Sequence, residues 1–348
     1  MNFDEYTKLG EPLKYVKSEA WHTAIGLQEV DGLKPSPYLI EIAKANIEGD
    51  ITFEDVKNRL NSYYKSQQTR SLIENRTEEA DKVSARIAEI LSEKTFVFSP
   101  AQYIGIHKRI FEGFKFAGAI RDYNITKDEW VLDGDTVYYS SADMINATLD
   151  YDFAAEKQFN YKGLADSELI EHFANFISGI WQIHPFCEGN TRAVAVFAIK
   201  YLRTLGINAT NYIFSTNSWY FRNALVRANY TNAPKNIYAN KQFLLNFFDN
   251  LILNGEHSLK NREMHINYND QETAKNVGVN VGRNVGVNLG GNDEKVYNLI
   301  KQNNNITNKQ IAYSLEISTR TAERICKKLK ELGVITRIGS TKTGSWKI

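Results

Sequence analysis

The chain has 348 residues, of which 43% are hydrophobic and 24% charged, so it can form two or three domains that each bury a core. Its two cysteines lie far apart, which excludes a disulfide framework and a CxxC metal pair, and the net charge of +1 favours no class of partner. The N-terminus lacks a signal peptide, and no stretch has the ~18 uninterrupted apolar residues of a membrane span, so we expect a cytoplasmic protein without a membrane partner.

Residues 1–66 are predicted to form a small helical unit. Pro35 and Pro37 are typical of the first turn of a helix, and Gly49 marks its end. Thr52, followed by two acidic residues, predicts the start of a second helix. A unit of this length is too small to be stable alone, so we expect it to pack against the domain that follows.

Residues 67–265 are predicted to form a mainly α-helical domain. Apolar residues recur at helical spacing in several windows, near residues 83–91, 103–111, 169–180, 194–201, 220–226 and 243–252. Between the second and third of these, Asp133-Gly134 separates two short β-prone runs within residues 130–139. That pattern predicts a β-hairpin.

The strongest local signal is the segment His-Pro-Phe-Cys-Glu-Gly-Asn-Thr-Arg at residues 184–192. Pro185 biases His184 away from the αR conformation, so the preceding helix should end there. A new helix should begin near Asn190. Its first N–H groups lack helical partners and lie at the positive end of the helix dipole, which is a site for phosphate.

The side chains of this segment supply the remaining chemistry. Glu188 offers a hard oxygen ligand for Mg²⁺, an ion that usually also binds substrate phosphates. Arg192 can hold a phosphate oxygen with its planar guanidinium group. His184 is the side chain best suited to take a proton near neutral pH. Each residue alone would more often be structural or solvated, but together they predict transfer of a nucleotidyl or phosphoryl group to a hydroxyl.

The segment resembles the signature of the Fic (Fido) family, His-Pro-Phe-x-(Asp/Glu)-Gly-Asn-Gly-Arg-x-x-Arg, and the likeness extends over residues 79–248. Most characterised Fic proteins transfer AMP from ATP to a Ser, Thr or Tyr hydroxyl of a target protein. The resemblance implies a mainly α fold, a Fic-type helical bundle with a β-hairpin flap. It also implies a protein adenylyltransferase that uses ATP and Mg²⁺ and modifies another protein or itself.

The resemblance also implies roles for single residues. His184 is expected to be the general base and Glu188 the magnesium ligand. The residues expected to bind nucleotide are Glu188, Gly189, Asn190, Thr191, Arg192, Phe221 and Asn229. The predicted hairpin is similar to the family's flap, which docks the target segment by strand-like pairing; its docking residues are expected to be Val137, Tyr138 and Tyr139.

Two residues depart from the family signature. Thr191 replaces the second glycine, at a helix start where threonine is acceptable. Ala195 replaces the second arginine, which in the family helps to hold the terminal phosphate and pairs with an inhibitory glutamate. The chain therefore lacks the usual partner of such a glutamate.

Many Fic proteins carry an inhibitory helix with the pattern (Ser/Thr)-x-x-x-Glu-(Gly/Asn), which residues 70–75 partly follow, with Arg70 in the Ser/Thr place. The likeness makes Glu74 a candidate inhibitory residue; an ordinary helix-end glutamate is the alternative. Residues 21–64 also resemble the small antitoxin-like modules found with Fic domains. Gln28 stands where such a module would carry glutamate.

Residues 266–292 contain a short Asn-Val-Gly repeat and are predicted to be a linker, with a β-forming or assembly role as the alternative. Residues 293–348 show three helical patterns followed by two strands, the order of a small winged helix-turn-helix domain. This last segment has 11 Lys and Arg against 5 Asp and Glu, a net charge of +6 that leaves the rest of the chain at −5. The asymmetry favours DNA as a partner, contacted by Ser318, Thr319, Arg320 and Arg324.

Other functions remain open from the sequence. Winged helices also serve as protein-interaction or dimerisation modules, so a homodimer is possible. The chain could be a DNA-binding transcriptional regulator whose Fic-like domain only senses nucleotide, or it could transfer a group from another phosphorylated donor. The intact His184 favours a transferase over the regulator.

Overall fold

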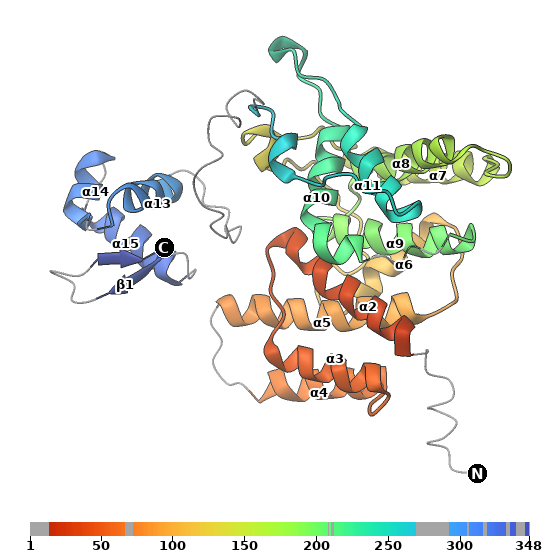
Figure 1. Ribbon diagram of the computed structural model, residues 1–348, viewed down its shortest axis with the longest axis horizontal. Helices are drawn as coiled ribbons and strands as arrows, with labels where there is room; N and C mark the ends of the chain where they lie inside the picture. The colour runs from red at the N-terminus through yellow and green to blue at the C-terminus, as the bar shows by residue number, and fades with distance from the viewer. Residues whose placement is uncertain are drawn as a thin grey trace. The chain divides into compact units, whose positions relative to one another are not determined.

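The computed structural model describes residues 14–66, 72–207, 209, 212–268, 292–304, 306–315, 319–331, 335–338 and 345–347. The chain divides into two compact units, Met1–Lys275 and Asn276–Ile348 (Figure 1). Each unit has its own hydrophobic core. The predicted boundaries at residues 66 and 265 stay predictions.

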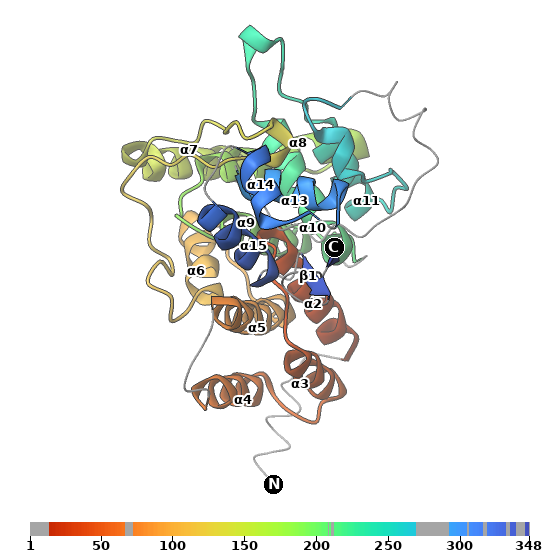
Figure 2. The ribbon, with the colours of Figure 1, turned by 90° about the vertical axis from the view of Figure 1, so that its left-hand side faces the viewer.

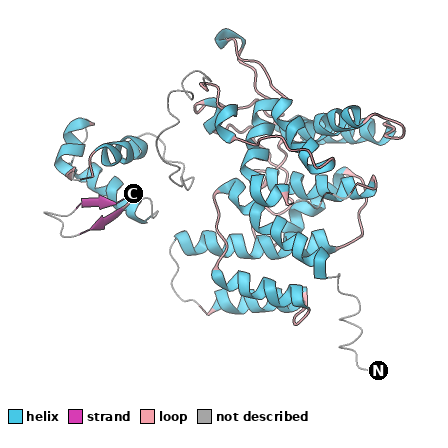
Figure 3. Cartoon of the chain, in the orientation of Figure 1, coloured by secondary structure: helices cyan, strands magenta, loops and turns pink. Residues whose placement is uncertain are grey.

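The described part of the first unit consists of helices and loops (Figure 3). Its α-helices are α2 (Lys14–Gly26), α3 (Pro37–Glu48), α4 (Phe53–Lys65), α5 (Leu72–Ser92), α6 (Pro100–Ile110), α7 (Ile145–Gln158), α8 (Asp166–Ile183), α9 (Asn190–Thr204), α10 (Ile213–Ala228) and α11 (Gln242–Ile252). Its short 3₁₀ turns are η1 (Leu27–Asp31), η2 (Trp130–Leu132), η3 (Ala142–Met144), η4 (Ala233–Lys235) and η5 (Asn261–Met264).

Helices α3 and α4 begin, and α3 ends, where the sequence predicts, whereas α2 is not among the predicted helices. Gly49 ends α3 at φ 86°, and the Thr52 side chain caps α4 in a reciprocal bond pair with Asp55. The two helices join the rest of the unit through the buried carboxylate of Asp81 in α5. This carboxylate accepts hydrogen bonds from the Ser36 hydroxyl at 2.5 Å and the Tyr64 hydroxyl at 2.6 Å. The expected packing against the following domain is therefore present.

Helix α9 lies at the centre of the first unit. All of its residues from Asn190 to Leu202 are buried, and it packs against α5, α6 and α8 (Figures 1 and 2). A helix that is buried on every side has to be apolar nearly all round, as this one is after its first turn. Because α9 cannot move without disturbing the core, its N-terminus is a rigid place for a binding site.

The loop at residues 127–140 differs from the predicted hairpin. The chain reverses where expected, with Asp133 at φ 55° and Gly134 at φ 84°. No strands form on either side; the 3₁₀ turn η2 occupies one arm, and the Glu129 N–H bonds to the Asp135 carbonyl at 3.0 Å. The apolar residues that favour a strand are instead buried in the core, Val131, Leu132 and Val137 among them. Core packing replaces strand pairing here.

The described part of the second unit has the predicted winged-helix order. It consists of α13 (Asn292–Gln302), α14 (Asn308–Ser314), α15 (Thr319–Glu331), β1 (Thr336–Ile338) and β2 (Ser345–Lys347). The strands pair antiparallel, with Arg337 opposite Trp346. The Trp346 indole N–H donates to the Ile306 carbonyl at 2.9 Å, which joins the wing to the helices. The predicted architecture, a mainly α bundle plus a small winged helix, is confirmed, without the flap strands.

Among the described residues, no helix is both long and apolar enough to cross a membrane.

Candidate active site

His184 lies at the C-terminal end of α8, in the left-handed conformation with φ 51°. Pro185 prevents the helix from continuing, as predicted. The backbone N–H and the imidazole Nδ1 both lie near the Trp181 carbonyl, at 3.1 and 3.2 Å. Nδ1–H therefore donates to that carbonyl, which leaves the lone pair on Nε2. The Nε2 atom is buried and has no hydrogen-bond partner among the described residues, and His184 lines a pocket at the start of α9.

The environment keeps this imidazole neutral. Burial lowers the pKa of His184 well below its usual value of 6.5, and the charge of Lys127 lowers it further. The Tyr139 ring lies against the imidazole, with 4.1 Å between ring centroids, and fixes its plane. At neutral pH the side chain therefore offers an unprotonated nitrogen in a defined position, which is what a general base requires.

The loop between α8 and α9 is held in place by its own polar groups. The Asn190 side chain accepts from the Phe186 N–H at 3.0 Å and donates to the Phe186 carbonyl at 2.7 Å. Gly189 adopts φ 75°, and a Cβ there would lie 2.2 Å from the Phe111 ring. The position therefore needs glycine for its conformation and for space. The Asn190 side chain, predicted to bind nucleotide, forms two hydrogen bonds within the loop, and Asn190 also lines the pocket.

Two residues that sequence reasoning missed complete this support. The His107 Nε2–H donates to the Glu188 carbonyl at 3.0 Å, and its Nδ1 accepts from the Gly118 N–H at 3.0 Å. Burial lowers the pKa of His107 to about 4, so it holds both bonds as a neutral ring. Arg121 donates to the carbonyls of His184 at 2.8 Å and Ile183 at 3.2 Å. It thereby binds the carbonyls at the C-terminus of α8.

Arg192, predicted to bind phosphate, is held by acidic residues. Its Nε lies 2.9 Å from Asp31 Oδ2, and a terminal nitrogen lies 2.9 Å from Glu79 Oε1. The other terminal nitrogen donates to Gln28 Oε1 at 3.2 Å, and the guanidinium lies 4.7 Å from the centre of the Phe111 ring. The side chain is 2% exposed. The group is therefore neutralised by η1 and α5 rather than free to hold an anion.

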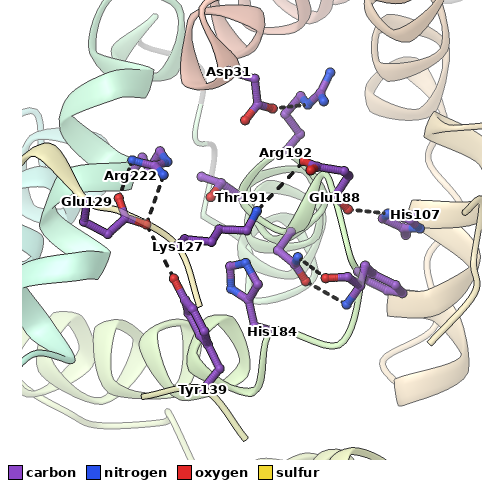
Figure 4. A network of polar contacts seen from close by, with 12 residues as sticks. Asp31, His107, Lys127, Glu129, Tyr139, His184, Glu188, Thr191, Arg192 and Arg222 are labelled. Carbon is purple, nitrogen blue, oxygen red and sulfur yellow. Dashed lines mark hydrogen bonds and ion pairs between the residues drawn. The ribbon is translucent and has the colours of Figure 1, made fainter. Parts of the chain in front are cut away.

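Lys127, which lines the pocket, forms an ion pair with Glu188 (Figure 4). Lys127 Nζ lies 3.9 Å from Glu188 Oε2, with the two side chains 28% and 58% exposed. Glu188 is thus accessible, as a magnesium ligand has to be. No group of three or more His, Cys, Asp or Glu side chains that could hold a metal ion occurs among the described residues.

A buried ion pair lies on the other side of His184 (Figure 4). Arg222 of α10 contacts both oxygens of Glu129, at 2.6 and 3.0 Å, and the Tyr139 hydroxyl donates to Glu129 Oε1 at 3.4 Å. Glu129 is fully buried, and burial raises its pKa while the charge of Arg222 opposes the rise. This pair connects the loop at residues 127–140 to α10 and holds the ring that contacts His184.

The remaining predicted residues fall into different places. The Thr191 hydroxyl lines the pocket and accepts from the Trp181 indole N–H at 3.0 Å. Asn229 ends α10 and donates to the Ser178 hydroxyl at 2.8 Å. Phe221, predicted to contact adenine, is instead fully buried against Phe247, with ring centroids 4.9 Å apart. Its ring packs within the core and is not accessible to a ligand, so the predicted contact with adenine is not supported.

The predicted docking residues differ in exposure, and the candidate inhibitory residue is described only in its backbone. Val137 is 1% exposed, Tyr138 is 81% exposed and Tyr139 contacts His184. Only Tyr138 of these offers its side chain to a partner. Glu74 lies in α5, but its side chain lies outside the described residues.

In the second unit, Thr319 begins α15, and Thr319 and Arg324 are both exposed. Ser318 and the side chain of Arg320 lie outside the described residues. The position of Thr319 and Arg324 on the third helix is the one that a recognition helix uses.

The geometry of the first unit defines a class of protein: a helical domain that places an unprotonated histidine beside the N-terminus of a buried helix. The comparisons agree. Residues 97–202 match the model of the Fic/DOC family, and residues 290–336 match a winged helix-turn-helix DNA-binding family. The chain therefore carries a Fic/DOC domain followed by a winged helix-turn-helix domain. No curated protein matches it.

Solved structures similar to this chain include two Bartonella effector proteins. BepC of Bartonella tribocorum, a VirB-translocated effector solved with bound AMPPNP, is 22% identical, with a TM-score of 0.40 over 54% of this chain and 94% of that one. The N-terminal Fic domain of Bep8 from Bartonella sp. 1-1C is 20% identical, with a TM-score of 0.42 over 56% of this chain and 93% of that one.

Proposed function

We propose that the chain is a protein adenylyltransferase, which transfers AMP from ATP to a Ser, Thr or Tyr hydroxyl of a target protein, itself included. The observation that carries the proposal is the buried, unpartnered Nε2 of His184 beside the N-terminus of α9. A neutral base next to a phosphate site is the equipment for attack by a hydroxyl on phosphorus.

The residues of the site support the following step. His184 Nε2 takes the proton of the target hydroxyl, whose oxygen then forms a bond to the α-phosphorus of ATP. The bond from that phosphorus to the bridging oxygen breaks, and pyrophosphate leaves with the electron pair. The hydrogen bond from Nδ1 to the Trp181 carbonyl stabilises the imidazolium ion that results.

The site fits a magnesium ion with one protein ligand. The Glu188 carboxylate is exposed beside Lys127 and supplies the hard oxygen that Mg²⁺ prefers, while water and substrate phosphates usually fill the other positions of the ion. When bound, the ion would neutralise phosphate charge.

Restraint of the enzyme is part of the proposal. Asp31 and Glu79 neutralise Arg192, which would keep it from binding an anion, and these contacts support the proposal of a restrained enzyme. Glu74 stays a candidate inhibitory residue, since a carboxylate near the phosphate site would repel ATP. A Glu74→Gly variant should modify itself faster, and an unchanged rate would remove Glu74 from the proposal.

We infer that the second unit binds DNA. The exposed Arg324 and Lys330 of α15 and the net positive charge of residues 293–348 support this. The affinity for duplex DNA should fall steeply as salt rises, because released counterions drive such binding. A flat salt dependence would favour a protein-interaction or dimerisation role for this unit.

The central test is incubation with ATP labelled at the α-phosphate, with and without Mg²⁺. We expect label on protein with the native chain and none with His184→Ala. His257→Ala, which removes a half-exposed histidine outside the site, is the matched control and should label normally. Nucleotide binding without label under any metal would favour a regulator that only senses nucleotide.

A further inference from the structure

Three of the basic side chains that lie close to the pocket are Arg192, Arg222 and Lys127. The first two are committed to close partners: Arg192 to Asp31 and Glu79, and Arg222 to both oxygens of Glu129. Ala195, one turn further along α9, is fully buried and adds no charge. In this arrangement neither arginine is available to an incoming polyphosphate.

Lys127 differs from both arginines. Its one ion pair among the described residues, with Glu188, spans 3.9 Å between partly exposed side chains, and such pairs contribute little net stability. Its backbone is fixed, because its N–H donates to the Thr136 hydroxyl at 3.0 Å. The ammonium group can therefore change partners without disturbing the loop that carries it.

The position of Lys127 is that of a ligand-binding group. Its side chain extends across the site towards the first turn of α9, between Glu129 and Glu188 and close to the His184 ring (Figure 4). It lines the same pocket as Gly189 and Thr191 at the start of α9. The pocket is thus lined by the first turn of a helix, whose N–H groups lack helical partners, by Lys127 and by His184, whose buried Nε2 has no hydrogen-bond partner among the described residues.

We propose that Lys127 is the cation that binds the polyphosphate of ATP in this site. Nucleotide binding exchanges its ion pair with Glu188 for one with phosphate oxygens, and it leaves the Glu188 carboxylate free for Mg²⁺. Lys127 thereby supplies a positive charge near the phosphate site, where α9 has Ala195 in place of the second arginine of the family signature. The inference rests on the proposed function, since it assigns a further residue to the same nucleotide site.

The test is the affinity of the full chain for ATP with Mg²⁺, measured by calorimetry without a target protein. Lys127→Ala should weaken ATP binding about tenfold or more, since a charge-assisted bond to phosphate is lost. Binding of adenosine should not change, because it has no phosphate. Lys127→Arg should recover most of the affinity for ATP. Lys162→Ala, which removes an exposed lysine elsewhere, should bind like the native chain.

Three results would overturn the inference. Lys127→Ala could bind ATP as well as the native chain, or it could bind ATP more tightly, which would make Lys127 a competitor of the ligand rather than a partner. The native chain could also fail to bind ATP. Binding is measured apart from transfer, so a chain that binds ATP through Lys127 but labels no protein would contradict only the proposed transferase function. Unchanged melting temperatures of the variants would show that they are folded.

Discussion

The Nε of Arg192 lies 2.9 Å from Asp31 Oδ2, although the two residues come from the start of α9 and from η1. The contact places a carboxylate of the N-terminal segment on the arginine of the Fic-type motif. Together with the Glu79 pair at 2.9 Å, it neutralises the guanidinium before any nucleotide arrives. The N-terminal segment is therefore connected directly to the candidate active site.

Release of Arg192 should raise activity. Asp31→Asn keeps the shape and an acceptor oxygen but removes the charge, so we expect self-modification several-fold faster than in the native chain. We also expect a loss of stability of about 1–3 kcal/mol, because a buried charge loses part of its compensation. Both can be measured, with labelled ATP and with urea unfolding. Asp50→Asn, at the exposed end of α3, is the control. A slower or unchanged Asp31→Asn variant would contradict a restraining role.

Much of this site could be predicted from local patterns. The turn at His184-Pro185, the helix start at Asn190 and the caps of α3 and α4 are set by residues within a few positions of each other, and all are present. These features depend on backbone geometry that proline, glycine and hydroxyl side chains control directly. The local sequence pattern is therefore sufficient to predict where the candidate active site lies.

Long-range contacts could not be predicted in the same way. Asp31 and Glu79 reach Arg192 from distant parts of the chain, and His107 reaches Glu188 from α6. A single sequence shows which residues are charged but not which ones the fold brings together. The prediction of a β-hairpin at residues 130–139 is wrong for a related reason. Val131 and Val137 favour strands locally, but both side chains are buried in the core, and this packing determines the conformation of the loop.

Gly189 should tolerate no side chain. In Gly189→Ala the new Cβ would lie 2.2 Å from Phe111 ring atoms, at a φ of +75°. We expect a loss of about 2–4 kcal/mol in the free energy of unfolding, because strain and overpacking add, and a fall in transfer activity. Gly163→Ala is the matched control, since its φ is +83° and nothing lies near its Cβ. It should cost about 1 kcal/mol, the backbone part alone. If both variants lose the same free energy of unfolding, then the Phe111 ring moves aside and the expected overpacking is absent.

His107 should make stability depend on pH. Its pKa in the folded chain is about 4, against an ordinary value of 6.5, so between these values the unfolded chain binds a proton that the folded chain does not. Stability should therefore fall as the pH drops from about 6.5 to about 4, by on the order of 3 kcal/mol from this residue. Urea unfolding across this range will show the slope. His107→Gln, which does not titrate, should be less stable at pH 7 but show a shallower slope; an identical slope would contradict the role of His107.

The Glu129–Arg222 pair should hold the loop beside His184. Arg222→Ala leaves the fully buried Glu129 carboxylate without its cation. Either the carboxylate takes up a proton, or the free energy of unfolding of the variant falls by about 3–5 kcal/mol. The Tyr139 ring would then lose its fixed hydrogen-bond partner, and transfer activity should fall through kcat more than through the KM for ATP. The double variant Glu129→Gln with Arg222→Gln removes both charges and can keep a hydrogen bond between the amides, so it should recover stability. If it is no more stable than Arg222→Ala, then the packing of these side chains, rather than the unpaired charge, determines the loss.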